Sequence, residues 1–213
     1  MTVAGALRSA LVDTYHFSWR LLIVNTSLSV AVALIVLFVS TFPLVLFLAP
    51  LLVGPIVAGL VHCVVTLIRD EEFQLSDAFV GLRRFWMRGF LLGGLSGAVL
   101  LLGALAVMFY GSERHRVLPL AVLAVYVVAL LSLVLLIGWL FAIAEPDVGI
   151  AGALHRAWLL ALRSPARLLV LGTALFLVNL AGAVTVLPFL TLTIAYSFLA
   201  TARLVLPTEE VTT

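Results

Sequence analysis

Four apolar stretches, each long enough to cross a bilayer, most strongly limit how this chain can fold. They cover residues 21–68, 89–110, 117–144 and 168–202. Hydrophobic residues make up 64% of the 213 residues and charged residues only 10%, against about a quarter in a typical soluble domain. So few charges cannot cover the surface of a soluble globule. We therefore expect an all-α, polytopic bundle of transmembrane helices.

The first and last stretches are too long for one crossing. Their 48 and 35 residues would form helices of about 72 and 52 Å, against a hydrocarbon core of about 30 Å. Pro43, Pro50, Gly54 and Pro55 interrupt the first stretch and Pro188 interrupts the last, so we expect both to fold back there. The six predicted spans are 21–42, 51–68, 89–110, 117–144, 168–186 and 189–205. Because only two residues separate the last two spans, five spans with one long kinked helix are the alternative.

The first predicted turn is itself apolar. Its sequence, PLVLFLAPLLVGP, contains no charged residue. Irregular backbone exposed to lipid is costly, so we expect this turn, including Phe47 and Leu48, to lie at a protein contact.

Arginine residues are distributed unevenly over the predicted loops. Ten lie in the N-terminal segment, the second and fourth loops and the tail, whereas only Arg114 and Arg116 lie in the third loop. Because basic residues concentrate in cytoplasmic loops, this pattern predicts that both termini are cytoplasmic and that the number of spans is even. The net charge of +2 then fits a bilayer with anionic headgroups better than a nucleic-acid partner.

An internal repeat predicts how the spans are grouped. Residues 6–25 align with residues 153–172, residues 78–94 fit the same frame, and each block precedes a predicted pair of spans. We therefore expect three helical hairpins, each preceded by an amphipathic helix at the membrane interface. The repeat units of this single membrane domain cover about 1–68, 69–144 and 145–206, followed by a short tail at 207–213.

The second and third amphipathic segments are candidate surfaces for a partner. In both, apolar side chains recur at helical spacing and arginines lie on other faces. Such helices lie in the interface with tryptophan at headgroup depth. They either anchor the bundle or also dock a soluble protein. The candidate surface residues are Phe79, Arg83, Arg84, Trp86, Arg88, Arg156, Trp158 and Arg163.

Small and polar residues within the spans predict sites of helix packing. Gly89, Gly93 and Gly97 recur at four-residue spacing, which removes side chains from one face and lets another helix approach closely. Asn25 and Asn179 lie in the first and fifth predicted spans, where a buried amide favours an interhelical hydrogen bond.

His62 and Cys63 lie midway along the second predicted span. An intramembrane histidine can pack between helices, relay protons, or bind haem iron or a pigment. No second histidine stands at ligand spacing, so helix packing is the main interpretation and a haem or pigment at His62 the alternative. The single cysteine excludes an internal disulfide and a cysteine-rich metal site.

No catalytic motif is recognisable in the sequence, so we expect no enzymatic activity. The chain has no phosphate-binding glycine loop, no HExxH and no GxSxG, and its acidic residues all lie in predicted loops or terminal segments. The absence of intramembrane acids argues against a proton- or sodium-coupled transporter, although a passive conduit stays possible.

The segment GPIVAGLVHCVVTLIRDEEFQLSDAFVGLRRFWMRGFLLG resembles the YesL family of small bacterial membrane proteins, as does the later block PDVGIAGALHRAWLLALRSPARLL. The family's genes are often found near carbohydrate-uptake systems. The resemblance implies an accessory role beside a transporter in the bacterial cytoplasmic membrane and brings no catalytic residues. The residues that carry it are Gly54, Pro55, Ala58, Gly59, Leu60, Arg69, Glu71, Phe79, Phe85, Arg88, Ala157, Arg163 and Pro165.

Three classes of function stay open. The first is a non-catalytic accessory or assembly subunit that contacts the bilayer and other membrane proteins. The second is a transport component, because Gly152, Ala153 and Pro165 match in outline the cytoplasmic coupling loop of import permeases driven by ATPases. The third is a haem- or pigment-associated subunit that uses His62.

Overall fold

A computed structural model describes residues 2–42, 45–72, 74–112, 118–185 and 193–206. Helices account for nearly all of these residues, which contain no β-strand. The eight helices of the described part are α1 (Val3–His16), α2 (Ser18–Thr41), α3 (Val45–Asp70), α4 (Leu75–Ser112), α5 (Leu118–Ala144), α6 (Ile150–Arg163), α7 (Pro165–Thr185) and α8 (Ile194–Val205).

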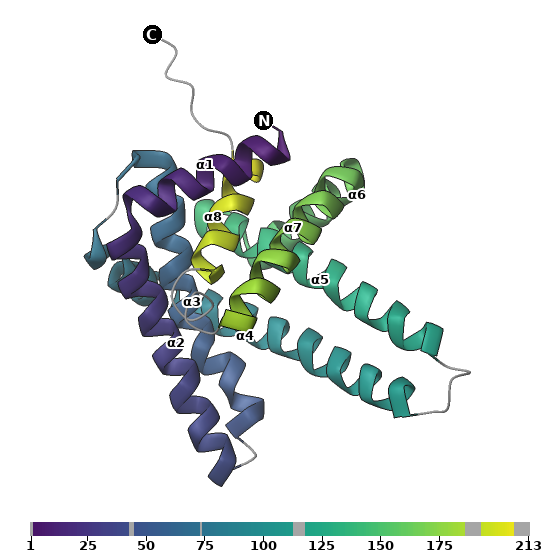
Figure 1. Ribbon diagram of the computed structural model, residues 1–213. Helices are drawn as coiled ribbons and strands as arrows, with labels where there is room; N and C mark the ends of the chain where they lie inside the picture. Colours follow the sequence, from purple (N-terminus) through teal and green to yellow (C-terminus); the bar gives the residue numbers. More distant parts are fainter. Residues whose placement is uncertain (1, 43–44, 73, 113–117, 186–192, 207–213) are drawn as a thin grey trace.

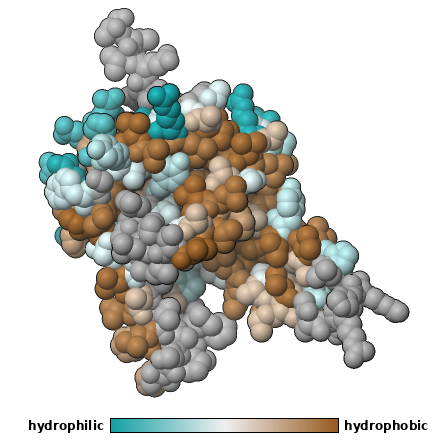
Figure 2. Space-filling view, viewed as in Figure 1, coloured by the Kyte–Doolittle hydropathy of each residue, from teal (hydrophilic) through white to brown (hydrophobic). Residues whose placement is uncertain are grey.

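The charged residues of the described part gather at one end of the molecule. They belong to α1, α6, the 71–72 and 145–149 connections, and the ends of the long helices that meet there. Figure 2 shows hydrophilic side chains mostly at this end and hydrophobic ones over most of the remaining visible face. Arg114 and Arg116, the two arginines expected on the opposite side, lie outside the described residues.

The described residues contain four helices that are long and apolar enough to cross a membrane, within α3, α4, α5 and α7. The count rises to five if α1 and α2, which are bent by 94° relative to each other, are taken together. The protein is therefore membrane-embedded. The sixth predicted span corresponds to α8, whose 12 residues extend for only about 18 Å. Pro188, the expected turn before it, lies outside the described residues.

Three breaks in helical geometry fall at equivalent positions of the sequence repeat. Phe17 separates α1 from α2 with φ −101° and ψ 18°, and Phe85 interrupts α4 with nearly the same angles, φ −112° and ψ 15°. Ser164 separates α6 from α7. Each break lies three residues before an arginine that the repeat aligns, namely Arg20, Arg88 and Arg167.

In the middle unit, a kink joins the expected amphipathic helix to the span that follows it. Residues 75–84 and the following span are both counted in α4, but the backbone leaves helical geometry at Phe85, where two helices meet at a kink. The start of this helix is fixed by Asp77, whose carboxylate accepts the backbone N–H of Gln74 at 2.7 Å. The expected boundary between the amphipathic helix and the span therefore falls at this kink, and the interfacial position of residues 75–84 stays a prediction.

The helices α1 and α6, which we expected at the membrane interface, share a packing pattern. Both α1 and α6 are 14 residues long. Ala6 and Ala10 of α1 are 0% exposed, as are Ala153 and Ala157 at the same places in α6. Alanine on the buried face lets a neighbouring helix come close. That neighbour is chiefly α8 for α1 and α5 for α6.

The expected turn around Pro50 and Pro55 is wrong. Both prolines lie inside α3, which begins at Val45, whereas α2 ends at Thr41 and Pro43 lies outside the described residues. A membrane helix tolerates proline because neighbouring helices and small adjustments satisfy the freed backbone groups. Leu48, expected at a protein contact, is 54% exposed, and the side chain of Phe47 lies outside the described part.

Candidate functional site

The predicted glycine face of α4 lies directly against α3. A Cβ atom at Gly89 would lie 2.7 Å from the carbonyl oxygen of Gly54, and one at Gly93 would lie 2.3 Å from that of Pro50. At Gly97 the added atom would meet the ring of Pro50 at 2.3 Å. Any side chain at these positions would collide with the backbone or a ring of α3. The two antiparallel helices therefore approach backbone to backbone.

Sequence reasoning missed the other half of this contact, on α3. A Cβ at Gly54 would lie 2.0 Å from the carbonyl oxygen of Gly89, and one at Gly59 would lie 2.6 Å from that of Ala78. Gly54 had been assigned to a turn because of the prolines around it. The four-residue spacing of Pro50, Gly54 and Ala58 on a helix was the available signal. We call this contact, formed by Pro50, Gly54 and Gly59 with Ala78, Gly89, Gly93 and Gly97, the α3–α4 seam.

His62 packs where the seam continues toward the C-terminal end of α3, and Cys63 is fully buried beside it. The imidazole centroid lies 5.5 Å from the ring centroid of Phe85, the residue at the break in α4. A Cβ at Gly81 would lie 2.5 Å from the Cβ of His62. Nδ1 of His62 is buried and has no hydrogen-bond partner in the described part of the chain. In this arrangement the ring serves helix packing.

Arg88 joins α4 to the end of α5. Its guanidinium donates to the carbonyl oxygens of Ala142 and Pro146. The last carbonyls of a helix have no partner within the helix and carry partial negative charge, so a cation suits this position. Arg88, one of the candidate partner residues, thus uses donors of its guanidinium inside the molecule.

Polar side chains connect further helices within the membrane region. Asn179 of α7 donates to the hydroxyl oxygen of Ser197 of α8 at 2.8 Å, and Asn25 of α2 is 0% exposed. Trp139 of α5 donates its indole N–H to the hydroxyl oxygen of Ser96 of α4 at 3.2 Å. The Trp139 contact was missed because nothing in the sequence pairs two residues 43 positions apart.

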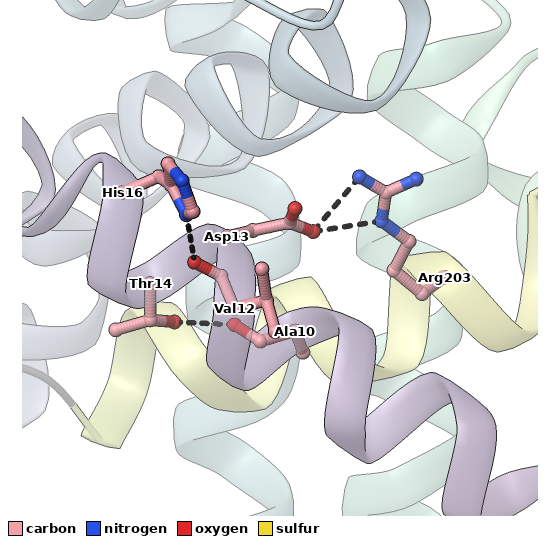
Figure 3. A network of polar contacts seen from close by, with 6 residues as sticks. All are labelled: Ala10, Val12, Asp13, Thr14, His16 and Arg203. Carbon is pink, nitrogen blue, oxygen red and sulfur yellow. Dashed lines mark hydrogen bonds and ion pairs between the residues drawn. The ribbon is translucent and has the colours of Figure 1, made fainter.

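The ends of the chain are joined by an ion pair between α8 and α1 (Figure 3). Nε and Nη2 of Arg203 each lie 2.8 Å from a carboxylate oxygen of Asp13, and both side chains are under one-fifth exposed. The hydroxyl of Tyr196 adds a bond to the carbonyl oxygen of Leu7 at 3.2 Å. Sequence reasoning counted Arg203 only as a charge in the tail.

The other candidate partner residues lie at the polar end. Phe79 is 75%, Trp86 55% and Trp158 43% exposed. Arg83, Arg84 and Arg163 are exposed as well. Arg84 lies over the ring of Phe85, and Arg156 forms an ion pair with Glu145.

A second feature that sequence reasoning missed is a crevice between α5 and α7. It has a volume of about 510 Å³, and its walls come from these two helices alone. The helices diverge in Figure 1, where α4 and α5 lean away from α7. Small and polar residues stand among the aliphatic ones in its walls. Those used below are Ala121, Tyr126, Ala129, Gly172, Thr173 and Phe176.

The described residues contain no group of three or more histidine, cysteine, aspartate or glutamate side chains placed to hold a metal ion. Comparisons of the chain with protein-family models, with curated proteins and with solved structures found no match. The argument for a function therefore starts from the surfaces just described.

Proposed function

We propose that this protein is a non-catalytic accessory or assembly subunit of a larger bacterial membrane complex, and that the α5–α7 crevice receives a transmembrane helix of a partner subunit. The crevice is the observation that carries the proposal. It lies between two helices that are apolar and long enough to span the membrane.

The distribution of burial supports a missing neighbour on this side. In the apolar stretch of α3, 56% of the residues are buried, against 17% in α4 and 22% in both α5 and α7. Most of the surface of α4, α5 and α7 is thus available to lipid or to another protein.

The composition of the crevice suits a helix. Ala121 and Ala129 on α5 and Gly172 on α7 leave room for a close backbone approach. Tyr126 and Thr173 supply hydroxyl groups that can bond to a polar residue of a neighbour, and Tyr126 is 53% exposed. Packing of this kind drives association of helices in lipid, where burial of apolar surface gives little gain.

The resemblance to the YesL family supports a specific first candidate for the partner. Because that family's genes lie near carbohydrate-uptake systems, a solute uptake transporter is the complex to look for first. The exposed arginines Arg83, Arg84 and Arg163 add a basic surface on the proposed cytoplasmic side for its soluble parts.

Purification from native membranes in a mild detergent, followed by mass spectrometry of the co-purifying proteins, tests the proposal. We expect recovery of a permease or another membrane subunit at fixed stoichiometry. Thr173→Trp, which fills the crevice, should abolish this recovery, whereas Val170→Trp, on another face of the same helix, should keep it. Recovery of the protein alone would contradict the accessory role and favour a self-sufficient transporter or channel.

A further inference from the structure

A separate crevice lies where α6 meets α4 and α5. Its volume is about 460 Å³, within the range of about 300–1,000 Å³ that is usual for small-molecule sites. The walls are aliphatic and include Leu95 and Val99 of α4 and Leu131 and Val134 of α5. The crevice therefore begins in the apolar part of the molecule and ends at an interfacial helix.

The rim that α6 contributes has a different chemistry. His155 and Trp158 line it, and neither side chain forms a hydrogen bond or an ion pair with any described residue. Trp158 is 43% exposed, and its indole N–H is a donor only. Tryptophan at the membrane interface usually pairs this N–H with a polar group while its ring stays in the apolar layer.

All the charged residues of α6 are basic. Within Ile150–Arg163 the helix contains Arg156 and Arg163 but no acidic residue. Arg156 is paired with Glu145, whereas Arg163 is exposed. The net positive charge of α6 favours an anionic over a cationic ligand group.

We propose that this crevice binds one anionic phospholipid. An acyl chain lies between α4 and α5 along Leu95 and Val99, and the phosphate and ester oxygens accept hydrogen bonds from His155 and Trp158. A phospholipid combines an apolar chain with acceptors at headgroup depth. A partner helix is a poorer match at this site, because its backbone carbonyls are already bonded within the helix.

The first test measures binding of palmitoyl-oleoyl phosphatidylglycerol to the purified full chain by native mass spectrometry during a lipid titration. The wild type should keep one lipid per chain. Leu95→Trp fills the crevice and should weaken binding by at least about tenfold, because several methylene groups lose their buried site. Leu100→Trp, on a face of α4 outside the crevice, should bind like the wild type. Equal binding by the two variants, or a wild type that retains no lipid, would overturn the proposal.

A second test addresses the rim and does not depend on how the tryptophan variants fold. His155→Ala and Trp158→Phe should each weaken phosphatidylglycerol binding by about fivefold, the effect of about one hydrogen bond. Inorganic phosphate alone should not raise the unfolding temperature, because it lacks the acyl chain. Unchanged binding by both rim variants, or stabilisation by phosphate alone, would contradict a phospholipid site.

Discussion

The α3–α4 seam and the α5–α7 crevice are both contacts between apolar helices, but they differ in how close the backbones come. At the seam, glycine meets backbone, and an added Cβ at Gly54 would lie 2.0 Å from an oxygen of Gly89. At the crevice, the nearest atom to an added Cβ on Gly172 is the end of the Leu133 side chain, at 3.2 Å. Gly54 is therefore enclosed by main-chain atoms, whereas Gly172 faces a side chain that can move.

This difference assigns different roles to the two regions. The seam fixes α3 against α4 and forms the rigid centre of the molecule. The distal part of α5 packs against α4, where a Cβ on Gly103 would lie 2.5 Å from a methyl carbon of Val128. The side of α5 that faces α7 lines the crevice, where we propose that a partner helix binds.

The largest effect is expected from alanine at the seam. Gly54→Ala should lower the free energy of unfolding by about 3 kcal/mol, because the methyl group overlaps main-chain atoms of Gly89 that cannot rotate away. Gly172→Ala is the matched control in the crevice wall. It should change stability by less than about 1 kcal/mol, since helix propensity offsets a contact that a side chain can relieve. Unfolding in mixed micelles measures both, and similar losses would remove the distinction between the regions.

Removal of the α4–α5 connection should have the next largest effect. Arg88→Ala leaves the terminal carbonyls of α5 without their charged donor and should cost about 2 kcal/mol. Arg83→Ala, an exposed arginine on the same helix, should cost less than about 0.5 kcal/mol. Thermal unfolding of the two variants measures both losses of stability. Equal losses would mean that Arg88 contributes only its charge and not its hydrogen bonds.

The ion pair between Arg203 of α8 and Asp13 of α1 lies away from both the seam and the crevice, and its removal should have a smaller effect on stability. A double-mutant cycle of Asp13→Asn and Arg203→Gln should give a coupling energy of about 1 kcal/mol, because the pair is only partly exposed. The binding of partner proteins should not change. A coupling energy near zero would show that the two helices are held by Tyr196 and apolar contacts instead.

The smallest effect is expected where α7 meets α8. Ser197→Ala removes the acceptor of Asn179 and should cost about 0.6 kcal/mol, the average for hydrogen bonds between membrane helices. The loss is small because Asn179 keeps its bond to the carbonyl oxygen of Leu175. A loss above about 2 kcal/mol in the same unfolding assay would show that this contact, and not the seam, organises the bundle.

The sequence predicts two of the long helices well because their bounds depend on local pattern. The apolar runs 117–144 and 168–186 correspond closely to α5 (Leu118–Ala144) and α7 (Pro165–Thr185). The frame that aligns Arg20 with Arg88 also places the breaks at Phe17 and Phe85. Local chain length and hydropathy decide these features.

The turns and the crevices could not be predicted in this way. Proline rules derived from water-soluble helices placed a turn at Pro50 and Pro55, whereas in α3 the helix continues through both. The pairing of Arg88 with Ala142 depends on the arrangement of helices far apart in the sequence. The same holds for the crevice, which exists only because α5 and α7 diverge.

Photo-cross-linking in native membranes tests the central claim most directly. A photoreactive amino acid replaces Phe176, which lines the crevice, or Phe38, which is 57% exposed on α2 and lies outside it. We predict a single protein adduct from position 176 and lipid adducts only from position 38. Protein adducts of equal yield at both positions, or lipid adducts alone at position 176, would contradict a partner helix in the crevice.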